Sequence, residues 1–232
     1  MEIEVVFVAG VLKYQSASVG TAVGVQGSNH PAKHNAGMTV VLVDGIWGRG
    51  VVFSPLCERL TARGHRCLVP ILQPNNAALG IADLAEKLKG FINARVDAES
   101  TISIVGFSLG CIVVRYYLQE LGGYLRTRCF FAICGPHHGT WTAFGYHGLG
   151  ARDLRPGSPL LRGLESSRAY LSCVSLHAYW TPFDLMILPA TSAHWSEATC
   201  LRILSPLHRL MPRNRRVQSD ILLNLERHCS AE

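Results

Sequence analysis

Thr101–Gly110, which reads TISIVGFSLG, is the stretch that decides the fold. It opens with a short β-branched run without charge, which is typical of a strand covered on both faces. A mostly apolar helical pattern follows from Leu109 to Leu121. Between them, glycines two residues before and two residues after Ser108 permit a strained turn that lifts the hydroxyl above the sheet. We therefore predict that Ser108 is a nucleophile; the alternative is an ordinary glycine-flanked turn.

Strand-like and helix-like segments alternate on both sides of this unit. Apolar and β-branched runs predict strands at 39–43, 67–72, 101–105, 129–133, 171–176 and 200–204. Apolar residues at steps of three and four predict helices at 51–63, 81–96, 109–121 and 217–228. Alternation at these lengths predicts the α/β class, with a mostly parallel central sheet and helices on both faces.

Two segments stand outside this alternation. Residues 1–37 are rich in Gly, Ser and Ala, and we expect an N-terminal arm or edge strand there. Residues 140–167 carry only weak helical signal between two strands, and we expect a lid-like insertion over the edge of the sheet. The main domain is then 38–232, since a chain of 232 residues suits one core.

Composition excludes several classes of protein. Charged residues make up 16% and hydrophobic residues 48%, which excludes a disordered chain. The net charge is +6, but its only local cluster, Arg213 with Arg215 and Arg216, has no interleaved aromatics, so we expect no nucleic-acid partner. The acidic start and the lack of an 18-residue apolar window favour a cytoplasmic protein, or a secreted one whose leader is missing from this chain.

Neither a metal nor an organic cofactor is expected. The eight cysteines are too sparse for a disulfide scaffold and form no C-x-x-C pair. Most are predicted to be buried thiols, in particular Cys111, Cys129, Cys134 and Cys173. His137 and His138 are adjacent on an extended segment, so their side chains point in opposite directions and cannot share one ion.

From Met38 to His228 the chain resembles the α/β-hydrolase family, and within it the small bacterial-type lipases and esterases. Four features carry the resemblance in order along the chain: the turn Asp44–Gly48, the serine pentapeptide, the segment Gly135–Thr140, and a late Asp and His. The resemblance implies an α/β-hydrolase fold in which the acid and the histidine follow the serine.

Asp184 is the best-placed acid after Ser108, because it follows a predicted strand across a short turn with Pro182. Asp153 falls in the expected lid and Asp220 in the last helical pattern. The alternative for Asp184 is a residue that caps a turn.

His208 is the expected base, because it follows the short strand 200–204 and precedes the closing helix. His194 lies before that strand and His228 at the tail, and His194 remains the alternative. A neutral imidazole oriented by a carboxylate removes a proton from a serine hydroxyl, which completes a catalytic triad.

The resemblance also assigns two oxyanion donors, the backbone N–H groups of Ile46 and Leu109. At the first of these sites the chain departs from the family, because Asp44-Gly45 stands where these lipases commonly show His-Gly. A carboxylate there is unhelpful unless it turns into the amides of its own loop. Trp47, Phe107 and Trp141 are expected to line the substrate pocket, with core packing as the alternative.

These patterns predict a serine carboxylester hydrolase of the esterase or lipase type, acting on a small-molecule or lipid ester. Transient contact with a lipid interface is compatible with the low charge of the insertion. Alternatives are a thioesterase or acyltransferase with the same triad, and a catalytically silent α/β-hydrolase that serves as a binding module.

Overall fold

The computed structural model describes residues 3–8, 11–16 and 37–229, and its centre is a parallel sheet. Within these ranges the parallel strands are β3 (Thr39–Val43), β4 (Arg66–Pro70), β5 (Ile102–Phe107), β6 (Thr127–Ile133), β7 (Ser175–Trp180) and β8 (Thr199–Arg202). Their order is β4-β3-β5-β6-β7-β8, so the strand before Ser108 is central.

An antiparallel hairpin extends the sheet beyond β4. It consists of β1 (Ile3–Val8) and β2 (Val11–Ser16), and β1 pairs with β4 at Glu4–Pro70 and Val5–Val69. The other residues of the expected N-terminal arm, apart from Gly37, lie outside the described residues.

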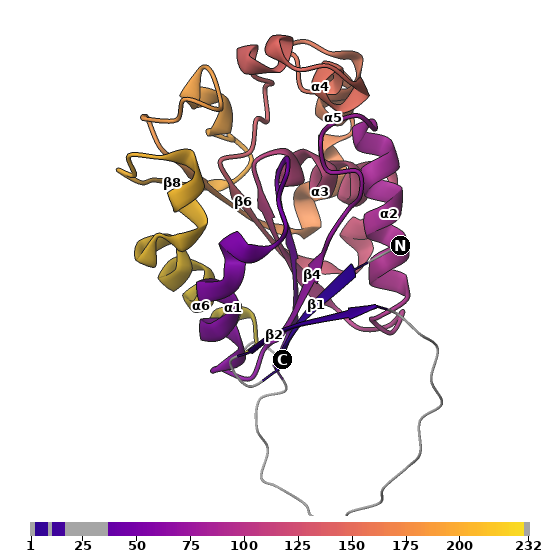
Figure 1. Ribbon diagram of the computed structural model, residues 1–232, viewed down its shortest axis with the longest axis vertical. Helices are drawn as coiled ribbons and strands as arrows, with labels where there is room; N and C mark the ends of the chain where they lie inside the picture. The colour runs from indigo at the N-terminus through magenta and orange to yellow at the C-terminus, as the bar shows by residue number, and fades with distance from the viewer. Residues whose placement is uncertain (1–2, 9–10, 17–36, 230–232) are drawn as a thin grey trace, which may run out of the picture.

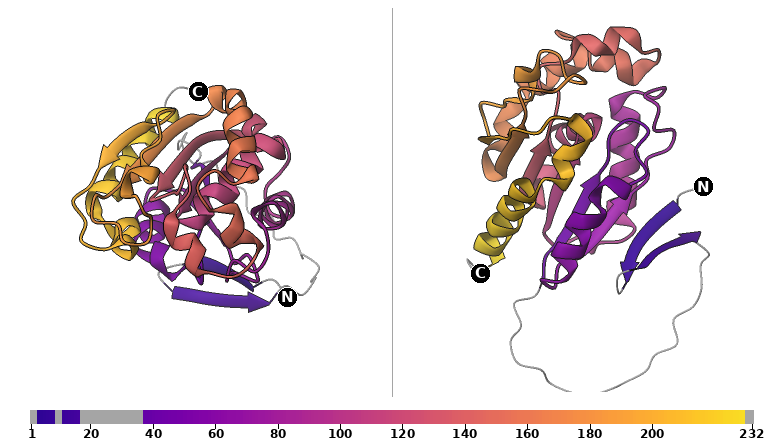
Figure 2. Two further views of the ribbon diagram at one scale, coloured as in Figure 1. Left: turned by 90° about the horizontal axis from the view of Figure 1, so that it is seen from above. Right: turned by 60° about the vertical axis from the view of Figure 1, so that its left-hand side comes forward.

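Helices cover both faces of the sheet, as Figures 1 and 2 show. The α-helices are α1 (Ser54–Thr61), α2 (Ile81–Asn93), α3 (Leu109–Glu120), α4 (Leu149–Asp153), α5 (Pro159–Ser166) and α6 (Arg215–Cys229). The 3-10 segments are η1 (Val51–Phe53), η2 (Gly123–Leu125), η3 (Trp141–Gly145), η4 (Arg168–Cys173), η5 (Ala190–Ala193) and η6 (His208–Arg213). Among the described helices, none combines the length and apolar character needed to cross a bilayer.

Alternate residues of each strand enter two separate cores. In β3, Val41 and Val43 pack in the core beneath α2 and α3, whereas Val40 and Leu42 pack in the core beneath α1 and α6. Burial on both sides explains why the strand is apolar without alternation. The predicted mostly parallel sheet with helices on both faces is confirmed.

The insertion between β6 and β7 lies over the carboxyl end of the sheet. It forms η3, α4 and α5, and these helices cap the top of the molecule in Figure 2. From its weak helical signal, we expected this segment to lie over the edge of the sheet. Its buried apolar residues Ala151, Leu161 and Leu164 join the core instead, which holds it over the strand ends.

Two expectations on the segment before β7 are wrong. The strand begins at Ser175, not at residue 171, because Leu171 to Cys173 complete the 3-10 segment η4. A short apolar run does not distinguish a strand from a helical turn. For the same reason Cys173, expected to be buried, is exposed.

Candidate active site

Ser108 occupies a strained turn at the carboxyl end of β5. Its backbone has φ 55° and ψ −125°, a conformation that residues other than glycine rarely adopt. A Cβ at Gly106 would lie 2.9 Å from the Cα of Cys111, and a Cβ at Gly110 only 2.4 Å from the carbonyl oxygen of Val43. Only residues without a side chain fit these two positions, and so β5 and α3 approach each other closely around Ser108.

Asp184 and His208 form a buried hydrogen-bonded pair. Asp184 lies in the loop after β7, and His208 begins η6 after β8. The Nδ1 of His208 lies 2.7 Å from Oδ2 of Asp184, and Oδ1 accepts the N–H groups of Met186 and Ile187 at 2.9 Å each. The carboxylate is therefore held on both oxygens.

The charge state of Asp184 follows from these contacts. Burial acts to raise the pKa of Asp184, but the hydrogen bond and charge of His208, with the two backbone N–H groups, lower the pKa overall. Asp184 is consequently an anion at neutral pH, which suits a group that orients an imidazole and stabilises its charged form.

Ser108 and His208 line the same cavity, which has a volume of about 460 Å³. The imidazole of His208 also packs against the ring of Phe107, with 4.8 Å between centroids, which restricts its orientation. In the part of the chain that the structure describes, no hydrogen bond joins the Oγ of Ser108 to His208. Such catalytic hydrogen bonds are often long in the absence of substrate.

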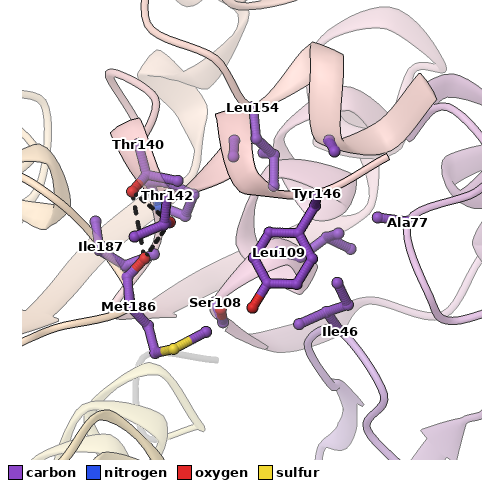
Figure 3. Close-up of a pocket in the computed structure, with 13 residues that line it drawn as sticks. Ile46, Ala77, Ser108, Leu109, Thr140, Thr142, Tyr146, Leu154, Met186 and Ile187 are labelled. Carbon is purple, nitrogen blue, oxygen red and sulfur yellow. Dashed lines mark hydrogen bonds between the residues drawn. The ribbon is translucent and has the colours of Figure 1, made fainter. Parts of the chain in front are cut away.

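A second, smaller cavity of about 40 Å³ also reaches Ser108 and is shown in Figure 3. Ile46 and Leu109, the two residues expected to supply oxyanion donors, both line it. Across the described residues, neither of their backbone N–H groups has a hydrogen-bond acceptor. Free N–H groups at this place can stabilise an oxyanion that forms on a carbonyl beside Ser108.

The carboxylate of Asp44 is turned into its own loop. Its two carboxylate oxygens accept the N–H groups of Gly45 at 2.7 Å and of Gly50 at 2.9 Å. A Cβ at Gly48 would overlap the carboxylate, at 2.2 Å from its Cγ. Burial raises the pKa of Asp44, and the two backbone hydrogen bonds and the charge of Arg209 oppose that rise. The departure from the family pattern thus organises the loop that carries Ile46.

The aromatic residues expected at the pocket separate into two groups. Trp47 and Phe107 line the larger cavity. Trp141 lines neither cavity; it is 62% exposed and stacks on Phe144 with 5.5 Å between ring centroids.

The alternative acids and bases have other partners. Asp153 accepts the N–H of Ile81 at 2.8 Å, which caps α2, and Asp220 accepts the hydroxyl of Tyr179 at 2.8 Å. The ring of His194 lies edge-on to Trp180. None of these three residues lines either of the two cavities described above.

Some residues at the site carry no signal in the sequence. Tyr146 and Met186 line both cavities, and Figure 3 shows their side chains on either side of Ser108. The hydroxyls of Thr140 and Thr142 donate to the carbonyl of Met186, at 3.2 and 2.7 Å, which fastens the insertion to the loop of Asp184. These residues converge only in the folded chain, so local spacing could not find them.

A possible metal-ligand set overlaps the acid–base pair. Ligand atoms of Cys134, Asp184 and His208 lie within 4.8 Å of one another. Burial and the charge of Asp184 raise the pKa of Cys134 well above its ordinary value, so the sulfur beside the carboxylate is a neutral thiol. Within this set, Asp184 and His208 are already joined by their 2.7 Å hydrogen bond.

Solved structures share this architecture. Lipase BlEst2 of Bacillus licheniformis, in its mature form, aligns with a TM-score of 0.66 over 84% of this chain and 96% of that chain, at 14% identity. The chain has the α/β-hydrolase fold. The same fold relates it to a carboxylesterase of Nitrososphaera gargenis, with a TM-score of 0.58, 14% identity and coverage of 85% of this chain and 93% of that chain.

A third similar structure is one of the metagenome-derived lipolytic enzymes LipS and LipT, with a TM-score of 0.61, 11% identity and coverage of 82% of this chain and 94% of that chain. No family model matches the sequence, and neither does any curated protein. The predicted fold and the resemblance to lipases and esterases are confirmed.

Proposed function

We propose that this protein is a serine carboxylester hydrolase, with Ser108 as nucleophile, His208 as base and Asp184 as the orienting acid. The observation that carries the proposal is the 2.7 Å hydrogen bond between Asp184 and His208, beside a cavity that His208 shares with Ser108. A carboxylate, an imidazole and a serine on a strained turn are the parts that nucleophilic acyl transfer needs.

In the acylation step the Oγ of Ser108 attacks the ester carbonyl while the Nε2 of His208 takes the hydroxyl proton. The carbonyl oxygen becomes an oxyanion, and the N–H groups of Ile46 and Leu109 donate to it. Collapse of this intermediate breaks the bond to the alcohol oxygen, and His208 returns the proton to the departing alcohol. The acyl group is then bound to Ser108 as an ester.

Deacylation repeats these events with water. His208 removes a proton from water, the hydroxide attacks the acyl carbonyl, and the bond to Ser108 breaks as its oxygen takes the proton back. The products are a carboxylic acid and free enzyme. Asp184 stays ionised in both steps, in keeping with its lowered pKa.

The test compares wild type with Ser108→Ala on p-nitrophenyl butyrate, together with labelling by a fluorophosphonate probe. The substitution should lower kcat by at least about a thousandfold and abolish labelling, since nothing else supplies the nucleophile. Ser166→Ala, at an exposed position on α5, is the matched control and should retain full activity.

Two further arms of this assay address the acid–base pair. Asp184→Asn should lower kcat by about 10³- to 10⁴-fold, because the imidazole loses its orientation. Asp220→Asn is the control, since Asp220 bonds to Tyr179 outside both cavities. Full activity of Ser108→Ala, or a probe attached to another residue, would reject the proposed triad.

A further inference from the structure

The larger cavity at Ser108 is lined by two arginines, Arg49 and Arg209. Arg49 lies in the loop that carries Ile46, and Arg209 directly follows His208, so the two arginines reach the lining of this cavity from different segments. The only acid in the lining is Asp44, whose carboxylate already accepts two backbone N–H groups. The charged side chains of this cavity therefore leave a surplus of positive charge.

Both arginines are available to a ligand. Within the described residues neither makes an ion pair or a side-chain hydrogen bond, and both are exposed to solvent. Other arginines of this protein do have anionic partners: Arg63 pairs with Glu226 at 2.9 Å, and Arg168 pairs with Glu165. Arg209 is close enough to Asp44 for its charge to oppose the rise in the pKa of Asp44, but no salt bridge forms between them.

The two cavities at Ser108 take different halves of an ester. The smaller one is lined by residues without charge and contains Ile46 and Leu109, whereas His208 lines only the larger one. In the mechanism above, His208 gives its proton to the departing alcohol oxygen, so that oxygen must lie beside the imidazole. The alcohol half is therefore in the larger cavity, together with both arginines, and the acyl half is in the smaller apolar one.

Building on the proposed function, we propose that the natural substrate is an ester whose alcohol half carries an anionic group, a carboxylate or a phosphate, which Arg49 and Arg209 bind. The planar guanidinium group forms paired, charge-assisted hydrogen bonds with both of these anions. Positive charge at the mouth also attracts an anionic substrate before it binds.

Three butyrate-sized esters test this assignment. They are p-nitrophenyl butyrate, its analogue with a carboxylate on the phenol ring (5-butyryloxy-2-nitrobenzoate), and p-nitrophenyl hemiglutarate, whose carboxylate is on the acyl half. Each kcat/KM is divided by the rate constant for hydrolysis by hydroxide, which removes the difference in intrinsic reactivity. Wild type should favour the ring-carboxylate ester over the neutral ester by about tenfold at low ionic strength, and 0.5 M NaCl should reduce this ratio.

Substitutions locate the source of the preference. Arg49→Ala and Arg209→Ala should each lower the ratio of ring-carboxylate to neutral ester by about three- to tenfold. Arg49→Lys and Arg209→Lys should retain part of it, because the charge remains but the paired geometry is lost. Arg63→Ala is the control. It removes the same unit of positive charge, but Arg63 follows α1 and does not line the cavity, so the ratio should be unchanged.

The outcomes separate the inference from the function beneath it. Suppose that the neutral ester is hydrolysed and that this activity depends on Ser108. If wild type then shows no preference for the ring-carboxylate ester, or if both arginine-to-alanine variants keep the preference, the inference is overturned and the hydrolase is left intact. A preference for the hemiglutarate alone overturns it as well, since the anion then belongs to the acyl half. No hydrolysis and no fluorophosphonate labelling overturn the proposed function and the inference together.

Discussion

At the scale of single residues, the turn at Ser108 depends on the glycine that follows it by two positions. A Cβ at Gly110 would lie 2.4 Å from the carbonyl oxygen of Val43 and 2.7 Å from that of Asp44, and backbone atoms cannot move away cheaply. We expect Gly110→Ala to lower the free energy of unfolding by about 3 kcal/mol and to abolish esterase activity. Urea unfolding followed by tryptophan fluorescence measures the first effect.

Gly90 provides the opposite case for comparison. It lies in α2, is exposed, and has no neighbouring atom within 4 Å of a Cβ. Gly90→Ala should raise the free energy of unfolding by about 0.5–1 kcal/mol, because alanine restricts the unfolded chain and favours the helix. Equal stability of the two alanine variants would show that close packing at Gly110 is not what the turn requires.

The residues of the site differ in how far the sequence could predict them. Ser108 could be placed from local spacing alone, because the strand, the two glycines and the helix are contiguous. Asp184 and His208 required the chain order implied by the family resemblance, since 24 residues separate them. Arg49, Arg209 and Tyr146 reach the cavities only through tertiary packing, which no local pattern records.

At the scale of elements, the insertion forms part of the wall of the smaller cavity, to which the proposed function assigns the acyl group. Several hydrogen bonds fasten it to the rest of the chain, among them those of Thr142 to the carbonyl of Met186 and of Asp153 to the N–H of Ile81. Leu154, directly after α4, lines the smaller cavity. Under the proposed function, a cavity of about 40 Å³ at this place predicts a preference for short acyl chains.

Truncation of this wall should lengthen the preferred chain. In Leu154→Ala, the kcat/KM for the octanoyl ester relative to the butyryl ester should rise about tenfold, since each extra buried methylene contributes about 0.8 kcal/mol. A p-nitrophenyl ester series measures this ratio. Leu125→Ala is the control, because Leu125 is 78% exposed in η2, and an unchanged ratio in Leu154→Ala would show that this wall does not limit the acyl chain.

The strands were predictable from the sequence where both of their faces are buried. The central strands are covered on both faces, so uninterrupted apolar runs identified β3, β5 and β6. The run before β7 was misread because Leu171 is buried in a helical turn and not in the strand. The helices of the insertion were too short to show a period, and only their contacts with the core define them.

At the scale of the whole molecule, buried neutral histidines link stability to pH. Burial, together with the charges of Arg115 and His138, lowers the pKa of His137 well below its ordinary value. Its ring stacks on Trp195 with 4.2 Å between centroids, and neither ring nitrogen has a hydrogen-bond partner among the described residues. Burial also lowers the pKa values of His65 and His177.

This arrangement predicts a loss of stability in mild acid. Below about pH 6.5 the unfolded chain takes up a proton at His137 that the native protein does not, so the free energy of unfolding falls as the pH falls. Between pH 7.5 and 5.5, His137 accounts for up to about 1.4 kcal/mol of this loss. Urea unfolding at both pH values measures the loss, and His137→Phe, which keeps the stacking on Trp195, should show a correspondingly smaller one. An identical pH dependence in both proteins would contradict this account.

The φ of 55° at Ser108 sets the requirements of catalysis against those of folding at one residue. A left-handed backbone costs a residue with a side chain about 1–3 kcal/mol, and glycine would relieve that cost. Thermal robustness alone would therefore favour glycine at this position, and under the proposed function the hydroxyl of serine is what offsets that cost.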